Sequence, residues 1–235
     1  MSYLKLDVDQ ASELKAAFRR GDWTNAEIKQ ACEGDFLAQA RRVILGKSRF
    51  VEVIPEKIKK TLTPFITIQV GDSTADQLLA DIQANRNENN VADEVSDEAK
   101  SMVAQKAFVI SATTRTVDLV ALSLAELGFT KPPHVGELMS AEFCARWSTE
   151  NLDGYVIELC QPEDGPQLCK QWLDQPMDTV VWMAMERIVI FDGWPTVFHV
   201  ERSANGRRWL HGHGALANNE LCLDFRLVFR LRKIV

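Results

Sequence analysis

The chain has 235 residues, of which 46% are hydrophobic and 26% are charged, and its formal net charge is −6 at pH 7. This composition excludes a disordered or fibrous protein and is typical of one generous domain, or of a large domain with a small companion. The sequence has no run of eighteen apolar residues to form a transmembrane helix, and its first eight residues lack the apolar core of a signal peptide. We therefore expect a cytoplasmic protein with no membrane partner.

The charges are distributed unevenly along the chain. Residues 61–165 hold six Lys and Arg against seventeen Asp and Glu, whereas the segments on either side are slightly basic. An acidic middle segment would repel a phosphate backbone, and no segment has the dense positive stripe of an autonomous nucleic-acid binder. Nucleic acid is therefore not expected as a partner.

Residues 1–60 predict a helical segment that is a candidate for a separate small unit. A first helix begins at Asp9, and the residues from Thr24 to Glu27 form a capping box that opens a second. Asp35 caps a third helix, whose apolar face holds Leu37, Ala40, Val43 and Ile44. A strand-like stretch follows at residues 50–54.

The second and third helices flank Gly34 and suggest a helix-turn-helix motif. That motif usually has a small residue four positions before the glycine, and the chain has Gln30 there. Arg41 and Arg42 point about 100° apart on a helix, so they cannot easily follow one phosphate backbone together. We predict a plain αα-hairpin without sequence-specific binding to duplex DNA.

Residues 61–235 predict an α+β domain that begins with mixed helices and strands. Alternating apolar residues predict a strand at 62–70, and apolar residues on most sides of 118–127 predict a central buried helix. Further segments are expected to be a helix after Ser73, a helix after Ser96, a β segment at 108–110, a helix at 137–147, a strand at 155–159 and a helix from Gln167.

After Pro176 the sequence becomes rich in β-branched and apolar residues. Strands are expected at 180–190, 196–202, 207–213 and 225–232, with turn signals at 192–193 and 205–206. Four strands with short connections predict a C-terminal antiparallel β-meander packed against the preceding helices. The last strand alternates apolar residues with Arg226, Arg230 and Arg232, which predicts one buried and one cationic face.

Several short segments resemble those of a group of uncharacterised bacterial proteins. The likeness covers roughly residues 107–233 and extends weakly to the helices at 27–46. This resemblance implies a bacterial origin and no activity. The segments that carry it are 125–129 (AELGF), 158–162 (ELCQP), 165–168 (GPQL), 174–176 (DQP) and 197–202 (VFHVER).

The His211-Gly212-His213 sequence has the character of a metal-binding motif. Residues i and i+2 of a strand project from the same face, so both imidazoles can reach one ion. A third ligand would come from the hairpin partner strand, which offers His199 or Glu201. The sequence therefore identifies His199, His211 and His213 as candidate zinc or iron ligands, with Glu201 as a further ligand or a base.

The register of this hairpin decides whether the site can form, and the sequence fits two turns. A two-residue Asn205-Gly206 turn sends His199 to the face opposite His211. A loop of residues 204–206 with Gly206 in the left-handed conformation places His199 opposite His211 and Glu201 on their face. Ordinary surface histidines are the remaining interpretation.

Among the six tryptophans, Trp194 and Trp209 are candidate binding residues. Trp194 lies in a turn where a large aromatic side chain can contact a partner, and Trp172 and Trp209 can line a groove with the histidines. The five cysteines include no C-x-x-C pair and lie beside apolar residues, so we expect reduced, buried thiols. The acidic pairs Glu163/Asp164 and Asp174/Asp178 are weak candidates for carboxylate catalysis.

The sequence contains no phosphate-binding glycine loop and no nucleophile elbow. Our first hypothesis is therefore a protein-interaction module that binds another protein and needs no cofactor. The alternative is a metal-dependent enzyme that uses the His-x-His strand motif with zinc or iron. The sequence leaves open whether the protein is an enzyme.

Overall fold

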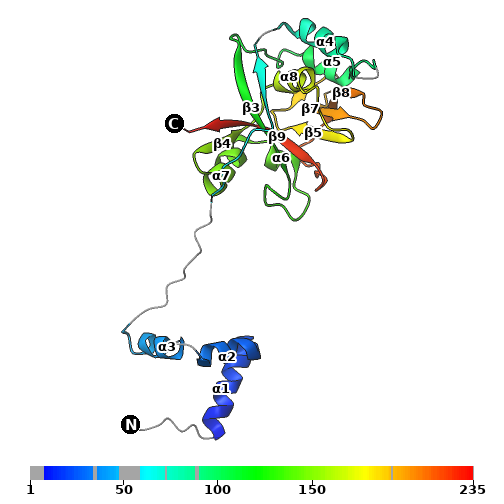
Figure 1. Cartoon of the computed structure of the whole chain (residues 1–235). Helices are drawn as coiled ribbons and strands as arrows, with labels where there is room; N and C mark the ends of the chain where they lie inside the picture. Colours follow the sequence, from blue (N-terminus) through cyan, green and yellow to red (C-terminus); the bar gives the residue numbers. More distant parts are fainter. Residues whose placement is uncertain are drawn as a thin grey trace. The chain divides into compact units, whose positions relative to one another are not determined.

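The structure is a computed structural model that describes residues 8–33, 36–47, 59–71, 73–87, 90–191 and 193–234. The chain divides into two units, residues 1–56 and 57–235, and each is described by itself (Figure 1). Among the described residues, no helix is long and apolar enough to cross a membrane. Independent folding of the N-terminal segment stays a prediction.

The first unit contains helices α1 (Val8–Arg20), α2 (Asn25–Glu33) and α3 (Phe36–Ile44). The capping box before α2 is confirmed, because the Thr24 N–H donates to Oε2 of Glu27 at 2.7 Å and the Glu27 N–H donates to Oγ1 of Thr24 at 3.3 Å. The expected cap at Asp35 and the expected strand at residues 50–54 lie outside the described residues.

Among the described side chains of the apolar face predicted for α3, Ala40 and Val43 are half-buried. Ile44 is 84% exposed, and Ala31 is the one buried side chain among the described residues of this unit. Arg41 and Arg42 are both exposed. The described side chains of this unit therefore form little buried core.

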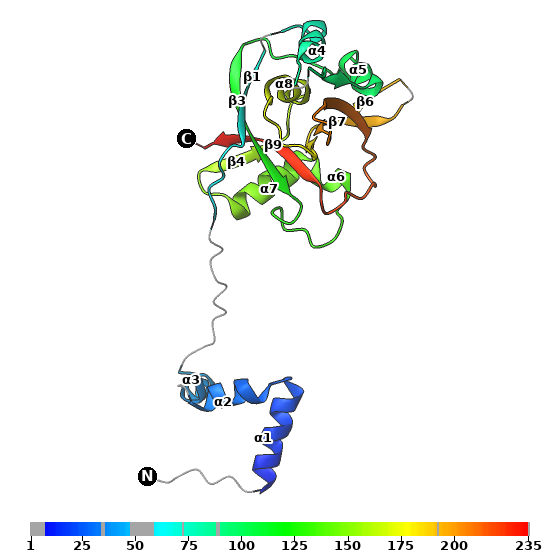
Figure 2. The ribbon, with the colours of Figure 1, turned by 45° about the vertical axis from the view of Figure 1, so that its right-hand side comes forward.

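The second unit is built on a single mixed sheet that curls into a half-barrel (Figure 2). Its strand order is β1-β3-β9-β5-β7-β8-β2, and β4 also pairs with β9 and β6 with β7. The strands are β1 (Ile66–Val70), β2 (Glu94–Val95), β3 (Arg115–Ser123), β4 (Tyr155–Glu158), β5 (Thr179–Met183), β6 (Ile188–Val189), β7 (Pro195–Arg202), β8 (Arg208–Gly214) and β9 (Arg226–Lys233).

The prediction of a C-terminal antiparallel meander is therefore wrong. Only β5, β7 and β8 follow one another as antiparallel neighbours, whereas β9 pairs with β3 and β4 and lies parallel to β5. The cause is the burial of β9 on both faces, since a strand with neighbours on both edges and layers on both sides belongs in the middle of a sheet. Its Leu227, Val228 and Phe229 are fully buried, and even Arg230 is only 9% exposed.

The buried helix predicted at residues 118–127 is also wrong, because these residues form most of β3 and the turn after it. β3 pairs with both β1 and β9, and its neighbouring Leu119 and Val120, which project from opposite faces, are both buried. A continuous apolar run does not distinguish such a strand from a buried helix. Residues 108–110, expected as a β segment, form no strand.

The described helices of this unit are α4 (Ala75–Ala84), α5 (Asp97–Val103), α6 (Val135–Leu138), α7 (Ala141–Asn151) and α8 (Asp164–Gln171). Helix α8 lies against β1, β7 and β8 (Figures 1 and 2). The approach is close, because a Cβ on Gly165 would lie 2.8 Å from Cβ of the fully buried Phe198 on β7. This packing covers one face of β7 and leaves His199 and Glu201 on the other.

Candidate functional site

The β7–β8 hairpin has the register that brings the histidines together. The backbone N–H of Ser203 donates to the Arg207 carbonyl at 3.0 Å, and Gly206 has φ +82°. The connection is thus the three-residue loop 204–206, and His199 lies opposite His211. Of the two turns that the sequence fits, this is the one that places both histidines on one face of the sheet.

His199, Glu201 and His211 form a compact group that we call the His/Glu cluster. Oε2 of Glu201 lies 3.9 Å from Nε2 of His199 and 3.8 Å from Nε2 of His211. The two imidazole rings stack with centroids 4.7 Å apart, and one ligand atom from each residue lies within 4.8 Å of the other two. Three donors of the types that zinc and iron prefer therefore converge on one point.

The cluster holds neutral imidazole on its buried side. Burial, together with the nearby His211 and His213 rings, lowers the pKa of His199 from 6.5 to about 3. Nδ1 of His199 is buried with no hydrogen-bond partner among the described residues, and the residue is 9% exposed. A neutral imidazole is the form that binds a metal ion. A buried nitrogen without a partner costs about 1–3 kcal/mol unless a ligand or water satisfies it.

His213, the third predicted ligand, lies beside this cluster. Its ring makes a T-shaped contact with Trp182, with ring centroids 4.6 Å apart, and its centroid lies 6.0 Å from that of His199. Burial and the nearby His211 lower its pKa. The geometry therefore groups Glu201 with His199 and His211, and it places His213 at the margin of the cluster.

Of the two predicted binding tryptophans, Trp209 borders the cluster. Its ring stacks on His211 with centroids 4.9 Å apart and an interplanar angle of 10°, and the Arg207 guanidinium lies 5.9 Å from it. Trp194 is 50% exposed and lies just before the first residue of β7, Pro195. It does not belong to the cluster.

A cavity of about 790 Å³ adjoins the cluster. His199, Glu201 and His213 form part of its wall, and Trp182 and Phe225 stack on each other in another part at 4.7 Å. Of the two tryptophans expected to line a groove with the histidines, Trp172 lines this cavity and Trp209 does not. Nothing in the sequence indicated the other walls, because β5, β7 and the segment before β9 come together only after the sheet has curled.

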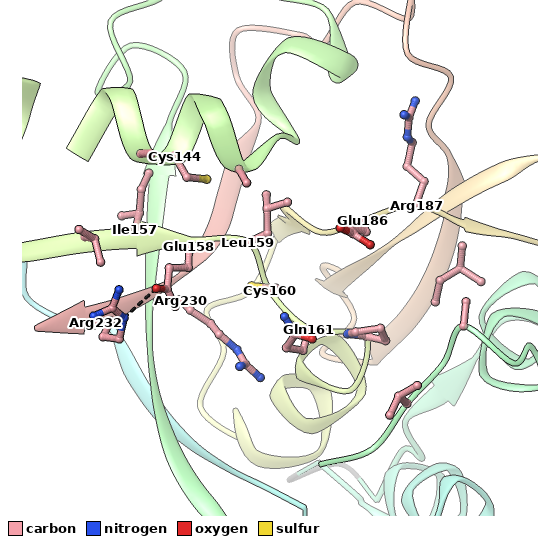
Figure 3. Close-up of a pocket in the computed structure, with 17 residues that line it drawn as sticks. Cys144, Ile157, Glu158, Leu159, Cys160, Gln161, Glu186, Arg187, Arg230 and Arg232 are labelled. Carbon is pink, nitrogen blue, oxygen red and sulfur yellow. Dashed lines mark hydrogen bonds and ion pairs between the residues drawn. The ribbon is translucent and has the colours of Figure 1, made fainter. Parts of the chain in front are cut away.

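A second cavity, of about 620 Å³, lies between α7, β4 and the segment before β6 (Figure 3). Two of its arginines are paired with carboxylates: Arg230 forms two hydrogen bonds with the buried Asp164 at 2.6 and 2.7 Å, and Arg232 donates to Glu158 at 2.7 Å. Burial raises the pKa of its Cys144 thiol to about 12. The arrangement stabilises the fold and offers no activated nucleophile.

The remaining sequence candidates have structural roles or differ from expectation. Glu163, in the first acidic pair, accepts hydrogen bonds from the Gly71 and Ser111 N–H groups at 3.0 and 2.9 Å. Asp164, the other member of that pair, binds Arg230. Burial was expected for all cysteines, and it is wrong for Cys32 and Cys222, which are exposed.

Comparison of the chain with protein-family models, curated proteins and solved structures gives no match.

Proposed function

We propose that this chain binds a divalent transition metal, zinc or iron, through His199, Glu201 and His211, and that the metal is the centre of a metal-dependent enzyme. The observation that supports the proposal is the convergence of two imidazoles and one carboxylate within 4.8 Å on neighbouring rigid strands. Two histidines and one carboxylate are the protein ligands of many catalytic zinc and iron sites.

Two of the three distances within the cluster are close to those that a metal ion requires. For bonds of about 2.1 Å, the ligand atoms of a tetrahedral site lie about 3.4 Å apart. The two Nε2–Oε2 distances of 3.9 and 3.8 Å exceed that edge by about 0.5 Å, which small side-chain rotations can supply. Three protein ligands leave at least one position for water or substrate, the arrangement that a catalytic metal needs.

Elemental analysis of protein purified without chelators tests the proposal. We expect close to one equivalent of zinc or iron, and a large loss of metal in the His211→Gln and Glu201→Gln variants. His134→Gln is the matched control, because His134 is exposed and its Nδ1 contacts the Asn218 carbonyl, away from the cluster. Less than about a tenth of an equivalent in the natural chain, or equal retention in all variants, would contradict the proposal.

A second candidate function is binding to another protein, and the exposed side chains near the β6–β7 turn support it. Val189 is 54%, Phe191 84% and Trp194 50% exposed. Neighbouring large apolar side chains on a surface are typical of interaction sites. A partner captured from the native host should be lost in a Phe191→Ser/Trp194→Ser variant. Capture that is unchanged in this variant would contradict the candidate.

A further inference from the structure

The cavity next to the His/Glu cluster has the size and position of a ligand site. Its volume of about 790 Å³ lies within the range of small-molecule pockets, about 300–1,000 Å³. His199 and Glu201 belong both to the cluster and to the cavity wall. A molecule in the cavity would therefore have one end at the cluster.

Aromatic rings make up much of the remaining wall. Trp182 and Phe225 lie nearly parallel, with centroids 4.7 Å apart and an interplanar angle of 16°. Trp172 packs edge-on against Phe65 at 5.0 Å. Because both pairs line the cavity, a bound molecule would contact aromatic side chains over part of its surface. Such surfaces favour a flat aromatic body over a flexible or highly hydrated one.

The charges of the wall disfavour an anionic ligand. Asp178, Asp224 and Glu201 contribute carboxyl groups, and Arg226 is the one Lys or Arg among the described lining residues. The Arg226 guanidinium donates to the Ala121 carbonyl at 2.9 Å and lies 3.8 Å from the Glu126 carboxylate. These contacts partly neutralise the positive charge that it could offer to a ligand. A carboxylate or phosphate ligand would meet more negative than positive charge.

We propose that this cavity binds a molecule without negative charge that has a flat aromatic body of one or two rings, and that an oxygen or nitrogen donor on the molecule points to the His/Glu cluster. The aromatic body would lie against Trp182, Phe225 and Trp172. The contact of the donor with a metal rests on the proposed function, whereas binding of the aromatic body does not. The proposal thus assigns aromatic compounds as the substrate class of the site.

Calorimetric titration of metal-free protein with 2-naphthol tests whether the cavity binds an aromatic molecule. We expect saturable binding that weakens about three- to tenfold in Phe225→Leu, the effect of losing one ring contact. Phe191→Leu is the matched control, because Phe191 is 84% exposed and does not line the cavity. 2-Naphthoate should bind at least about tenfold more weakly than 2-naphthol, because of the carboxyl groups in the wall.

The orientation of the bound molecule is tested on zinc-loaded protein with benzohydroxamate and acetohydroxamate. Both have the same metal-binding hydroxamate group, and only benzohydroxamate has an aromatic ring. Burial of the ring should make benzohydroxamate about ten- to a hundredfold tighter. Phe225→Leu should reduce that ratio and Phe191→Leu should not. Equal affinity for the two hydroxamates, no binding of 2-naphthol, equal effects of the two substitutions, or equal affinity for 2-naphthoate would each overturn the proposal.

The two experiments separate this inference from the proposed function. Protein that retains no zinc yet binds 2-naphthol through Phe225 refutes the metal site and supports the aromatic cavity. Protein that retains zinc through Glu201 yet does not bind 2-naphthol supports the metal site and refutes the cavity.

Discussion

Replacing Gly206 by alanine tests whether the hairpin register is fixed by the turn or by the strands. Gly206 has φ +82°, and a Cβ added there would lie 3.0 Å from Nδ2 of Asn87. An L-residue in the left-handed conformation costs about 1–2 kcal/mol. The Asn87 side chain cannot move freely, because its Oδ1 accepts a hydrogen bond from the Val91 N–H at 2.9 Å.

The alternative for the variant is to move to the two-residue turn. A one-residue slip would turn the fully buried Phe198 and Val200 of β7 to the opposite face. Loss of a buried Phe alone costs about 3–5 kcal/mol, more than the strained alanine. We therefore expect Gly206→Ala to keep its register, and with it the zinc affinity that we propose, while its free energy of unfolding falls by about 1–2 kcal/mol.

Urea unfolding followed by tryptophan fluorescence measures this change. With a slope of about 2 kcal/mol per molar urea, the midpoint should fall by about 0.5–1 M. Gly154→Ala is the control, since Gly154 has φ +68° and no atom lies within 4 Å of an added Cβ. Its alanine variant therefore has the conformational cost of the left-handed backbone but no steric contact. An unchanged midpoint would refute the conformational argument. In protein that binds zinc, a more than tenfold loss of zinc affinity would show that the register had moved.

Three further outcomes follow from the packing of the second unit. Asp164→Asn leaves the buried Arg230 without its counter-charge and should cost about 3–5 kcal/mol in urea unfolding; a loss below about 1 kcal/mol would contradict this. Gly165→Ala places a Cβ 2.8 Å from Cβ of Phe198 and should cost about 1–3 kcal/mol in thermal unfolding, so an unchanged Tm would speak against the close packing. At pH 8, Ellman's reagent should label the exposed cysteines well before Cys144, whose buried thiol has a pKa of about 12; mass spectrometry showing equal rates would disprove it.

Local signals in the sequence were sufficient for the helix caps and for the positions of the hairpin strands, although they left two turns open for the hairpin. The capping box at Thr24 and Glu27 forms as expected, and Ser96 caps α5 by accepting from the Ala99 N–H. The strands and turn of the β7–β8 hairpin also lie close to their predicted positions. In each case a few side-chain and backbone groups fix the outcome within about ten residues.

Distant pairing could not be read from the sequence. The Arg residues of β9 alternate with apolar residues and indicate a solvent-exposed face, but Arg230 is buried because Asp164 neutralises it from α8. Nothing in either local sequence reveals this partnership. The same limit applies to the choice between Glu201 and His213 as the third ligand, since both lie on the face of His199 and His211 and only the side-chain orientations distinguish them.

The central position of β9 has a consequence for how the second unit folds. β3 leaves the ribosome more than a hundred residues before the strand that pairs along its edge, as the pairing of Leu119 with Arg230 shows. Folding must therefore close a very long loop, which is slow compared with local hairpin formation. Until that closure, the apolar faces of β3 are available to other nascent chains, and chaperone dependence at high expression levels is the expected result.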